Sequence, residues 1–133
     1  IGGPTPTTPV AVLNNPTPAD SDFFGESVAI SGTRVVIGAY SDDTNATNTG
    51  SAYVYDLASA TPTTPVVTLN NPAGAAGAYQ EFGSAVAVLG SQVLVGTLLG
   101  NHPLVSYAGS VSVYDMGSTI PSVPILTLDN PDP

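Results

Sequence analysis

Residues 24–38 read FGESVAISGTRVVIG, and residues 82–96 read FGSAVAVLGSQVLVG. Both stretches are short runs of β-branched and small residues around a central glycine, and β-branched runs bounded by glycine are typical of strands. Each therefore predicts a strand, a tight turn and a second strand. The turns are expected at Ser31-Gly32-Thr33 and Leu89-Gly90-Ser91. The predicted strands are 24–31 and 34–40 in the first stretch, and 82–89 and 92–97 in the second.

The repetition extends beyond these two stretches, in a constant order. GSAYVYD at 50–56 returns as GSVSVYD at 109–115. TPTTPVAVLNNP at 5–16 returns as TPTTPVVTLNNP at 61–72, and in altered form at 119–131. A period of about 56 to 59 residues indicates a repeat architecture. The additional predicted strands are 51–57 and 110–115, which come third in each repeat, and 9–13, 65–69 and 123–128, which come fourth.

No stretch has apolar residues at helical spacing over three turns, so the sequence predicts an all-β protein. In the first predicted strand, Phe24, Val28 and Ile30 share one face, and Gly25, Ser27 and Ala29 share the other. The residues named on the two faces are uncharged, which indicates burial on both sides. A large-residue face that packs on a small-residue face suits sheets stacked one after another, as in the blades of a propeller.

The same residues resemble bacterial FG-GAP repeats, which are related to the propeller blades of integrin α-subunits. Phe24-Gly25 and Gly38-Ala39 lie where the motifs that name the family lie. The second copy departs from the pattern, because Gly96-Thr97 replaces Gly-Ala. The resemblance implies four-stranded antiparallel β-propeller-type blades and an extracellular or cell-surface role in adhesion or assembly. It implies no enzyme activity.

We interpret 1–133 as a single repeat segment. It contains blade repeat 1 at 5–60, blade repeat 2 at 61–118 and the start of a third repeat at 119–133. The fourth strand of each blade is expected to close the edge of the same blade, so strand 9–13 is left over as an extra strand. The chain opens on IGGP and not on Met, which suggests a processed or excerpted product.

The composition restricts the partners of the chain. It has one Lys or Arg, ten Asp or Glu and a formal net charge of −9. Binding to nucleic acid needs several basic side chains, so nucleic acid is excluded as a partner. No segment is apolar and long enough for membrane insertion. Cysteine is absent, and the bias toward Thr, Ser, Asn, Gly and Pro suits an extracellular location. The sequon that begins at Asn45 permits glycosylation only if the source glycosylates.

One polar loop is a candidate calcium site. Asp42, Asp43, Asn45 and Asn48 offer hard oxygen ligands of the kind that calcium prefers. The spaced Asp-x-Asp-x-Asp-Gly pattern of integrin-like cation loops is not present. The alternative is a solvated turn in which Asp and Asn side chains bond their own backbone. No other cofactor is expected.

The pattern of the other carboxylates, the histidine and the tyrosines favours a structural role for each of them. Asp20 and Asp22 are interpreted as a polar linker and not as a catalytic pair. Asp56 and Asp115 end equivalent strands and are interpreted as turn-forming residues. His102 is the only imidazole, so a metal site with several histidines or a catalytic triad is disfavoured. The tyrosines are expected to pack between blades, although they could stack on sugars; these are Tyr53, Tyr55, Tyr107 and Tyr114.

From these observations we expect a structural protein that acts by self-assembly with copies of itself. It would be a filament or surface-layer subunit, joined by strand addition between subunits. The alternative is an adhesin or a lectin-like module that binds a carbohydrate or surface ligand, with or without calcium. An enzyme is not expected.

Overall fold

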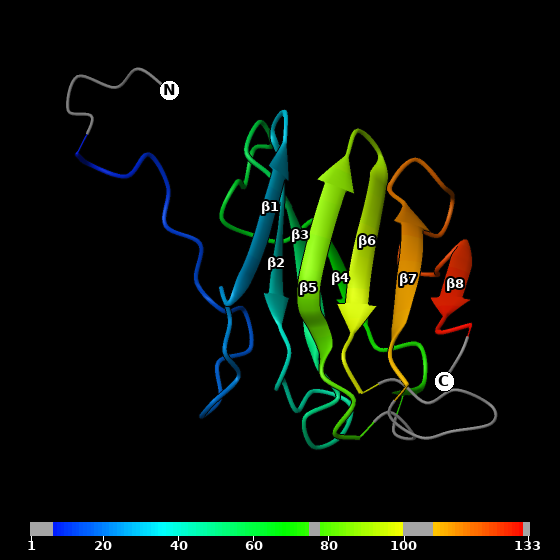
Figure 1. The fold of residues 1–133 in the computed structure, drawn as a ribbon. Coiled ribbons are helices and arrows are strands. Elements are labelled where there is room, and N and C mark those ends of the chain that lie inside the picture. Colours follow the sequence, from blue (N-terminus) through cyan, green and yellow to red (C-terminus); the bar gives the residue numbers. More distant parts are fainter. Residues whose placement is uncertain (1–6, 75–77, 100–107, 132–133) are drawn as a thin grey trace.

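The structure is a computed structural model that describes residues 7–74, 78–99 and 108–131. These residues form two four-stranded antiparallel sheets and no α-helix (Figure 1). The all-β prediction with four-stranded antiparallel blades is therefore confirmed. In both sheets the strands lie side by side in chain order. The first sheet contains β1 (Ser27–Ser31), β2 (Arg34–Ala39), β3 (Ser51–Asp56) and β4 (Val67–Asn70). The second contains β5 (Phe82–Leu89), β6 (Gln92–Thr97), β7 (Ser110–Asp115) and β8 (Leu126–Asp129).

Two-residue turns join the first two strands of each sheet, as predicted. Ser31 pairs with Arg34, so that Gly32 and Thr33 form the turn, and Leu89 pairs with Gln92 in the same way. Gly32 has a φ of 60°. Two-residue hairpin turns need this left-handed conformation at their first central position, and glycine adopts it without a steric cost.

The two sheets pack face to face, and faces of different kinds meet. The small-residue face of the first sheet carries Ser27, Ala29 and Gly38. It packs on the large-residue face of the second, whose buried or half-buried members include Phe82, Val86 and Val88. The prediction of a large-residue face on a small-residue face is confirmed. The shared core consists of Val36, Ala52, Val54, Leu69, Phe82, Val93, Val95 and Tyr114.

The hairpin tips of the two sheets are also joined. Arg34, the only basic residue of the chain, donates a hydrogen bond from its guanidinium to the carbonyl oxygen of Gly90. The backbone N–H of Gly90 in turn donates to the Ser31 hydroxyl at 3.2 Å. The two bonds link the first hairpin to the second at the hairpin tips, which lie at the opposite end of the strands from the Phe-Gly segments.

Three expectations about strand bounds are wrong. Residues 9–13 form no strand, β1 begins at Ser27 and not at Phe24, and β8 begins at Leu126 and not at Val123. A strand exists through hydrogen bonds to a neighbouring strand, and the described residues supply no neighbour for 9–13. The backbone at Gly25, with a φ of 92°, turns away from the regular ladder.

Residues 10–17 nevertheless occupy a defined place on the outer face of the first sheet (Figure 1, blue). Leu13 packs against a cluster that includes Ile37, Tyr53 and Tyr55. In the same way Leu69 of β4 packs in the core with Val95 and Tyr114 of the second sheet. Leu13 therefore holds the position that a leucine in the fourth strand of a preceding sheet would hold. The described residues contain no other strand of such a sheet.

Candidate functional site

The loop between β2 and β3 contains the residues predicted to bind calcium, and Asp42 is its buried anchor. Asp42 is only 2% exposed. One carboxylate oxygen accepts hydrogen bonds from the Thr44 backbone at 2.7 Å and from the Thr44 hydroxyl. The other accepts the hydroxyl proton of Tyr53. Burial, followed by the bond to Asp42, raises the pKa of Tyr53 to about 12. This carboxylate thus ties the loop to the face of the sheet.

The other three predicted ligands are exposed or half-buried. Asp43 is exposed, and its carboxylate accepts the backbone N–H of Asn48 at 2.6 Å. Asn45 is exposed, and Asn48 has a φ of 49° within the turn. Among the described residues, no three His, Asp or Glu side chains are grouped to hold a metal ion. The observed bonds match the self-bonded turn that was the alternative; calcium binding here stays a prediction.

A second polar network surrounds Asp22, which is 4% exposed. Its Oδ2 accepts from the Asn15 side chain at 2.6 Å and from the Ala19 backbone at 2.8 Å. Asp20, by contrast, is exposed. The pair Asn71 and Gln80 repeats this contact one repeat later, with 3.2 Å between the two amides. Asp22 is therefore a buried anchor between Asn15 and the first Phe-Gly segment, so the expectation of a flexible polar linker is wrong for this residue.

The junction between the sheets centres on Phe82-Gly83, at the start of β5. Phe82 is fully buried, and its backbone N–H donates to the Thr49 carbonyl at 3.0 Å. The Gly83 carbonyl accepts the Ser27 hydroxyl at 2.7 Å. A β-bulge between Phe82 and Ala85 creates this corner, and Gly83 has a φ of 92° there. Gly25 has the same φ of 92°. The two Phe-Gly segments are thus repeated corners, which we call the Phe-Gly corners.

Residues 10–55, which include the first Phe-Gly corner, match the family model described as FG-GAP repeat. The chain contains an FG-GAP repeat. Together with the two sheets this establishes a β-propeller-like repeat module. No curated protein matches the chain significantly. The described residues include no helix that is both long and apolar enough to cross a membrane.

The matched FG-GAP repeat ends within β3, but the second sheet repeats its elements in the same order. The register of the second sheet also repeats that of the first. Gly38 pairs with Ala52, and Gly96 pairs with Val111. The departure at Thr97 leaves β6 intact, because Thr97 pairs with Ser110 as Ala39 pairs with Ser51.

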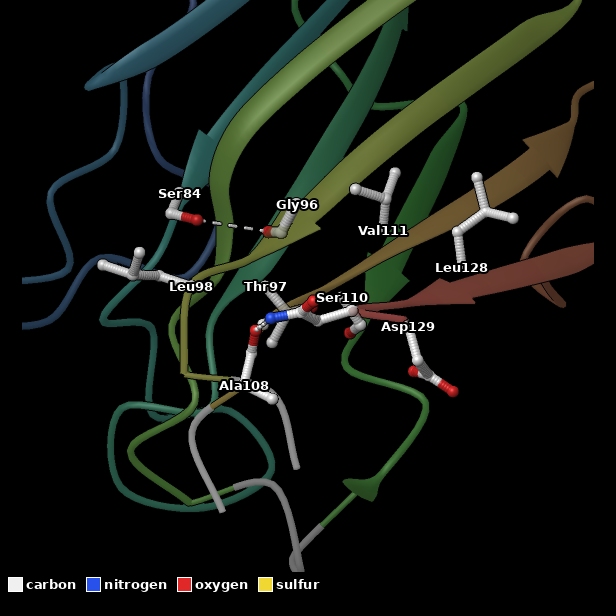
Figure 2. A pocket seen from close by; sticks show the side chains of 11 residues that line it. Ser84, Gly96, Thr97, Leu98, Ala108, Ser110, Val111, Leu128 and Asp129 are labelled. Carbon is white, nitrogen blue, oxygen red and sulfur yellow. Dashed lines mark hydrogen bonds between the residues drawn. The ribbon is translucent and has the colours of Figure 1, made fainter. Parts of the chain in front are cut away.

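The outer, small-residue face of the second FG-GAP-like sheet contains a hollow of about 520 Å³ (Figure 2). We call it the outer hollow. Gly96 and Val111 lie at its floor, and Leu128 of β8 and Leu98 border it. The Ser84 hydroxyl donates to the Gly96 carbonyl at 3.3 Å along one side. The remaining lining residues are Thr97, Ala108, Gly109, Ser110, Asp129 and Asn130.

The carboxylates that end the third strands form turns, as predicted. Asp56 accepts the Ala58 backbone N–H, and Asp115 accepts the Gly117 backbone N–H, both at 2.9 Å. Hydrogen bonds from the Thr33 side chain and then the Ala58 backbone lower the pKa of Asp56. Hydrogen bonds from the Gly117 backbone and then the Ser91 side chain lower that of Asp115.

The tyrosines of the third strands pack in the interior of the FG-GAP module. Tyr114 is buried between the two sheets, which confirms packing between blades for this residue. Tyr53 and Tyr55 are buried on the outer face of the first sheet, against Leu13 and Phe24, where the described residues place no second blade. Tyr107 and His102 lie outside the described residues.

Sequence reasoning missed the glycines that receive a Phe-Gly corner. Gly38 and Gly50 lie so close to the second corner that an added Cβ would be 2.0 Å from the carbonyl oxygens of Gly83 and Phe82, respectively. Their counterparts Gly96 and Gly109 border the outer hollow. The signal was in the sequence, because both glycines recur at equivalent positions of the two repeats.

Proposed function

We propose that this protein is a structural, extracellular module that acts by self-assembly with copies of itself, as a filament or surface-layer subunit. Strand addition between subunits accompanies the stacking of their sheets. A head-to-tail contact that does not close produces a filament, and one that closes produces a ring. The typical extracellular placement of FG-GAP repeats supports the location.

One observation carries this proposal. The two outer faces of the pair of sheets are of the same two kinds, one large-residue and one small-residue, as the two faces that pack together between the sheets. The first sheet presents a large-residue face, on which Val28 and Ile30 are each 64% exposed. The second sheet presents a small-residue face with the outer hollow. Apolar faces of this kind, next to unpaired strand edges, favour association.

The polar side chains support a structural role and not an enzymatic one. The buried carboxylate of Asp22 accepts hydrogen bonds from Asn15 and Ala19. That of Asp42 accepts hydrogen bonds from Thr44 and Tyr53. Those of Asp56 and Asp115 hold turns. A single basic residue, Arg34, also leaves almost no site for trypsin-like proteases, which suits an exposed fibre.

Electron microscopy of the native material, with mass determined under non-denaturing conditions, tests the proposal. We expect fibres or rings whose masses are multiples of the 13.3 kDa mass of the chain. The amount of these assemblies should rise with protein concentration. A well-folded, dispersed monomer at every accessible concentration would overturn self-assembly.

A ligand-binding role as an adhesin or lectin-like module is the second candidate. A polar hollow of about 310 Å³ near the Asn71–Gln80 pair favours it, because amides, hydroxyls and a carboxylate line that hollow. Such groups suit the hydroxyls of a carbohydrate. Binding to a glycan array by protein that stays monomeric would favour this role. A dispersed monomer that binds no glycan would exclude it for the sugars on the array. The lining residues are Asn71, Pro72, Ala73, Gln80, Thr97, Ser110, Ser112, Thr127 and Asp129.

A further inference from the structure

The outer hollow repeats the receiving side of the internal junction. In the first sheet, Ala52 and Leu69 share a core with Phe82. Their counterparts in the second sheet are Val111 and Leu128, which pair with each other as Ala52 pairs with Leu69. Both counterparts line the hollow. No Phe-Gly corner among the described residues fills it.

The receiving glycines show the difference between an occupied and an open site. A Cβ added to Gly38 would lie 2.0 Å from the Gly83 carbonyl oxygen, in the neighbouring sheet. Among the described residues, the three atoms nearest to a Cβ added at Gly96 all belong to Ala85, and the nearest lies at 3.4 Å, an ordinary contact within the same sheet. Gly96 therefore has room for a side chain in the single chain. If a Phe-Gly corner from another chain packed against Gly96, it would fill the space that an added Cβ needs.

The inserting half is open at the other end of the stack. Gly25 and Gly83 share a φ of 92°. A Cβ added to Gly83 would lie 2.4 Å from the Ser51 carbonyl oxygen, whereas one added to Gly25 would meet no described residue within 4 Å. Phe24 is half-buried and its ring lies 5.8 Å from that of Tyr53. The first Phe-Gly corner is thus already shaped for insertion and has no receiving sheet among the described residues.

We propose that the Phe24-Gly25 corner of a second copy of this chain fills the outer hollow, so that copies stack head to tail. This inference rests on the self-assembly proposed above and names its contact. The occupant is a second copy because the internal junction already shows which segment this surface receives. Each added copy repeats the packing of the second sheet against the first.

The head-to-tail contact forces a choice between two segments. Residues 10–13 lie against the first sheet as β4 lies against the second sheet. In a head-to-tail stack they would therefore occupy the same space as β8 of the neighbouring copy. Both cannot lie beside β7. Asn15 binds Asp22 next to the inserting corner, as Asn71 binds Gln80 next to Phe82. The incoming copy therefore brings residues 10–13 as the fourth strand, and β8, whose four residues are all exposed, is displaced. Leu13 of the incoming copy then takes the place of Leu128 beside Val111 in the lining of the hollow.

Two single substitutions test the contact in the full chain. Gly96→Ala blocks the receiving half, and Phe24→Ala removes the inserting half. We expect each variant alone to need at least roughly tenfold more protein than the wild type for half-assembly. Mixed, they pair, because the intact corner of Gly96→Ala enters the open hollow of Phe24→Ala. Native mass spectrometry should then show a heterodimer and no longer species. Thr63→Ala, in an exposed loop, is the matched control.

The outcomes separate the contact from the wider proposal. Gly96→Ala must keep the wild-type circular dichroism spectrum and melting temperature. Assembly of Gly96→Ala at wild-type concentrations would overturn the head-to-tail contact and leave self-assembly standing. Homodimers of either variant as abundant as heterodimers in the mixture would also overturn it. A wild type that never assembles would overturn both.

Discussion

Gly38 and Gly83 face each other across the two sheets so closely that a methyl group on Gly38 would lie 2.0 Å from the carbonyl oxygen of Gly83. The Ser27 hydroxyl, which binds the same oxygen, would lie 2.2 Å from that methyl group. The close approach lets Phe82 reach the core. Glycine at position 38 is therefore a condition for stacking and not only a strand residue.

Gly38→Ala should separate the sheets. The obstacle is backbone, which cannot swing away as a flexible side chain can, so we expect a loss of about 3 kcal/mol in the free energy of unfolding, or more. Urea denaturation followed by circular dichroism measures it. Gly96→Ala is the matched control at the equivalent position and should change the stability of the single chain little. Equal losses in the two variants would contradict the close packing.

The sequence was sufficient to predict the hairpin turns, the order of the strands and which faces of the sheets pack together. The Gly32 and Gly90 turns, the strand order within each sheet and the polarity of stacking were all predicted, because turn chemistry and side-chain alternation are local properties. The self-bonded turns of Asp56 and Asp115 were also predicted. Their recurrence with the repeat distinguished them from catalytic residues.

The missed features depend on partners that are distant in sequence. The Phe-Gly corner looked like the start of a regular strand, but the Ser27 hydroxyl and the Gly38 backbone of the other sheet shape its surroundings. Residues 9–13 read as a strand because their composition matches β4. Pairing needs a neighbour, however, and composition cannot supply one. The position of Leu13 above Tyr53 and Tyr55 likewise required coordinates.

The two phenylalanines of the corners should differ in their contribution to stability. Phe82 is fully buried between the sheets, so Phe82→Ala should cost about 3–5 kcal/mol. Phe24 is only half-buried, so Phe24→Ala should cost less than half as much in the single chain. Urea denaturation of both variants, at concentrations where the wild type is monomeric, measures the difference. Similar losses would mean that Phe24 is already fully packed without a second copy.

Alkaline pH should destabilise the fold through two buried tyrosines. Burial raises the pKa of Tyr53 and of Tyr114 from 10.0 to about 12. An unfolded chain releases these protons near the ordinary value, so stability is complete below about pH 10 and is lost as pH rises toward about 12. Melting temperature measured across this range should fall, and the Tyr53→Phe, Tyr114→Phe double variant should fall less steeply. An identical slope in wild type and double variant would assign the loss to other groups.

Calcium should affect neither folding nor assembly if the loop after β2 is purely structural. The Asp42 carboxylate is bound by Thr44 and Tyr53, and that of Asp43 by Asn48. We therefore expect the same melting temperature and the same fibre yield in millimolar calcium and in excess chelator. A calcium-dependent rise in melting temperature that Asp43→Ala abolishes would instead favour the ligand-binding role.

If the fourth strand is exchanged, substitutions at the equivalent leucines Leu13 and Leu128 should change assembly in opposite directions. Leu13 is half-buried on the first sheet, and it would enter the neighbouring copy beside β7. Leu13→Asn should therefore weaken assembly, because it places a polar side chain in the new junction. Leu128 is 50% exposed in β8, the strand that leaves. Leu128→Asn should loosen β8 and speed assembly, since the incoming segment must displace β8 before it can pair with β7.

The rate of fibre growth, followed by light scattering after a rise in concentration, distinguishes the two variants. Thr127→Ser, on the same strand as Leu128, is the control and should grow at the wild-type rate. Slower growth in both leucine variants would mean that β8 stays in place and that Leu128 itself packs on the incoming Phe24. Residues 10–13 would then be the segment displaced, because only one fourth strand fits beside β7.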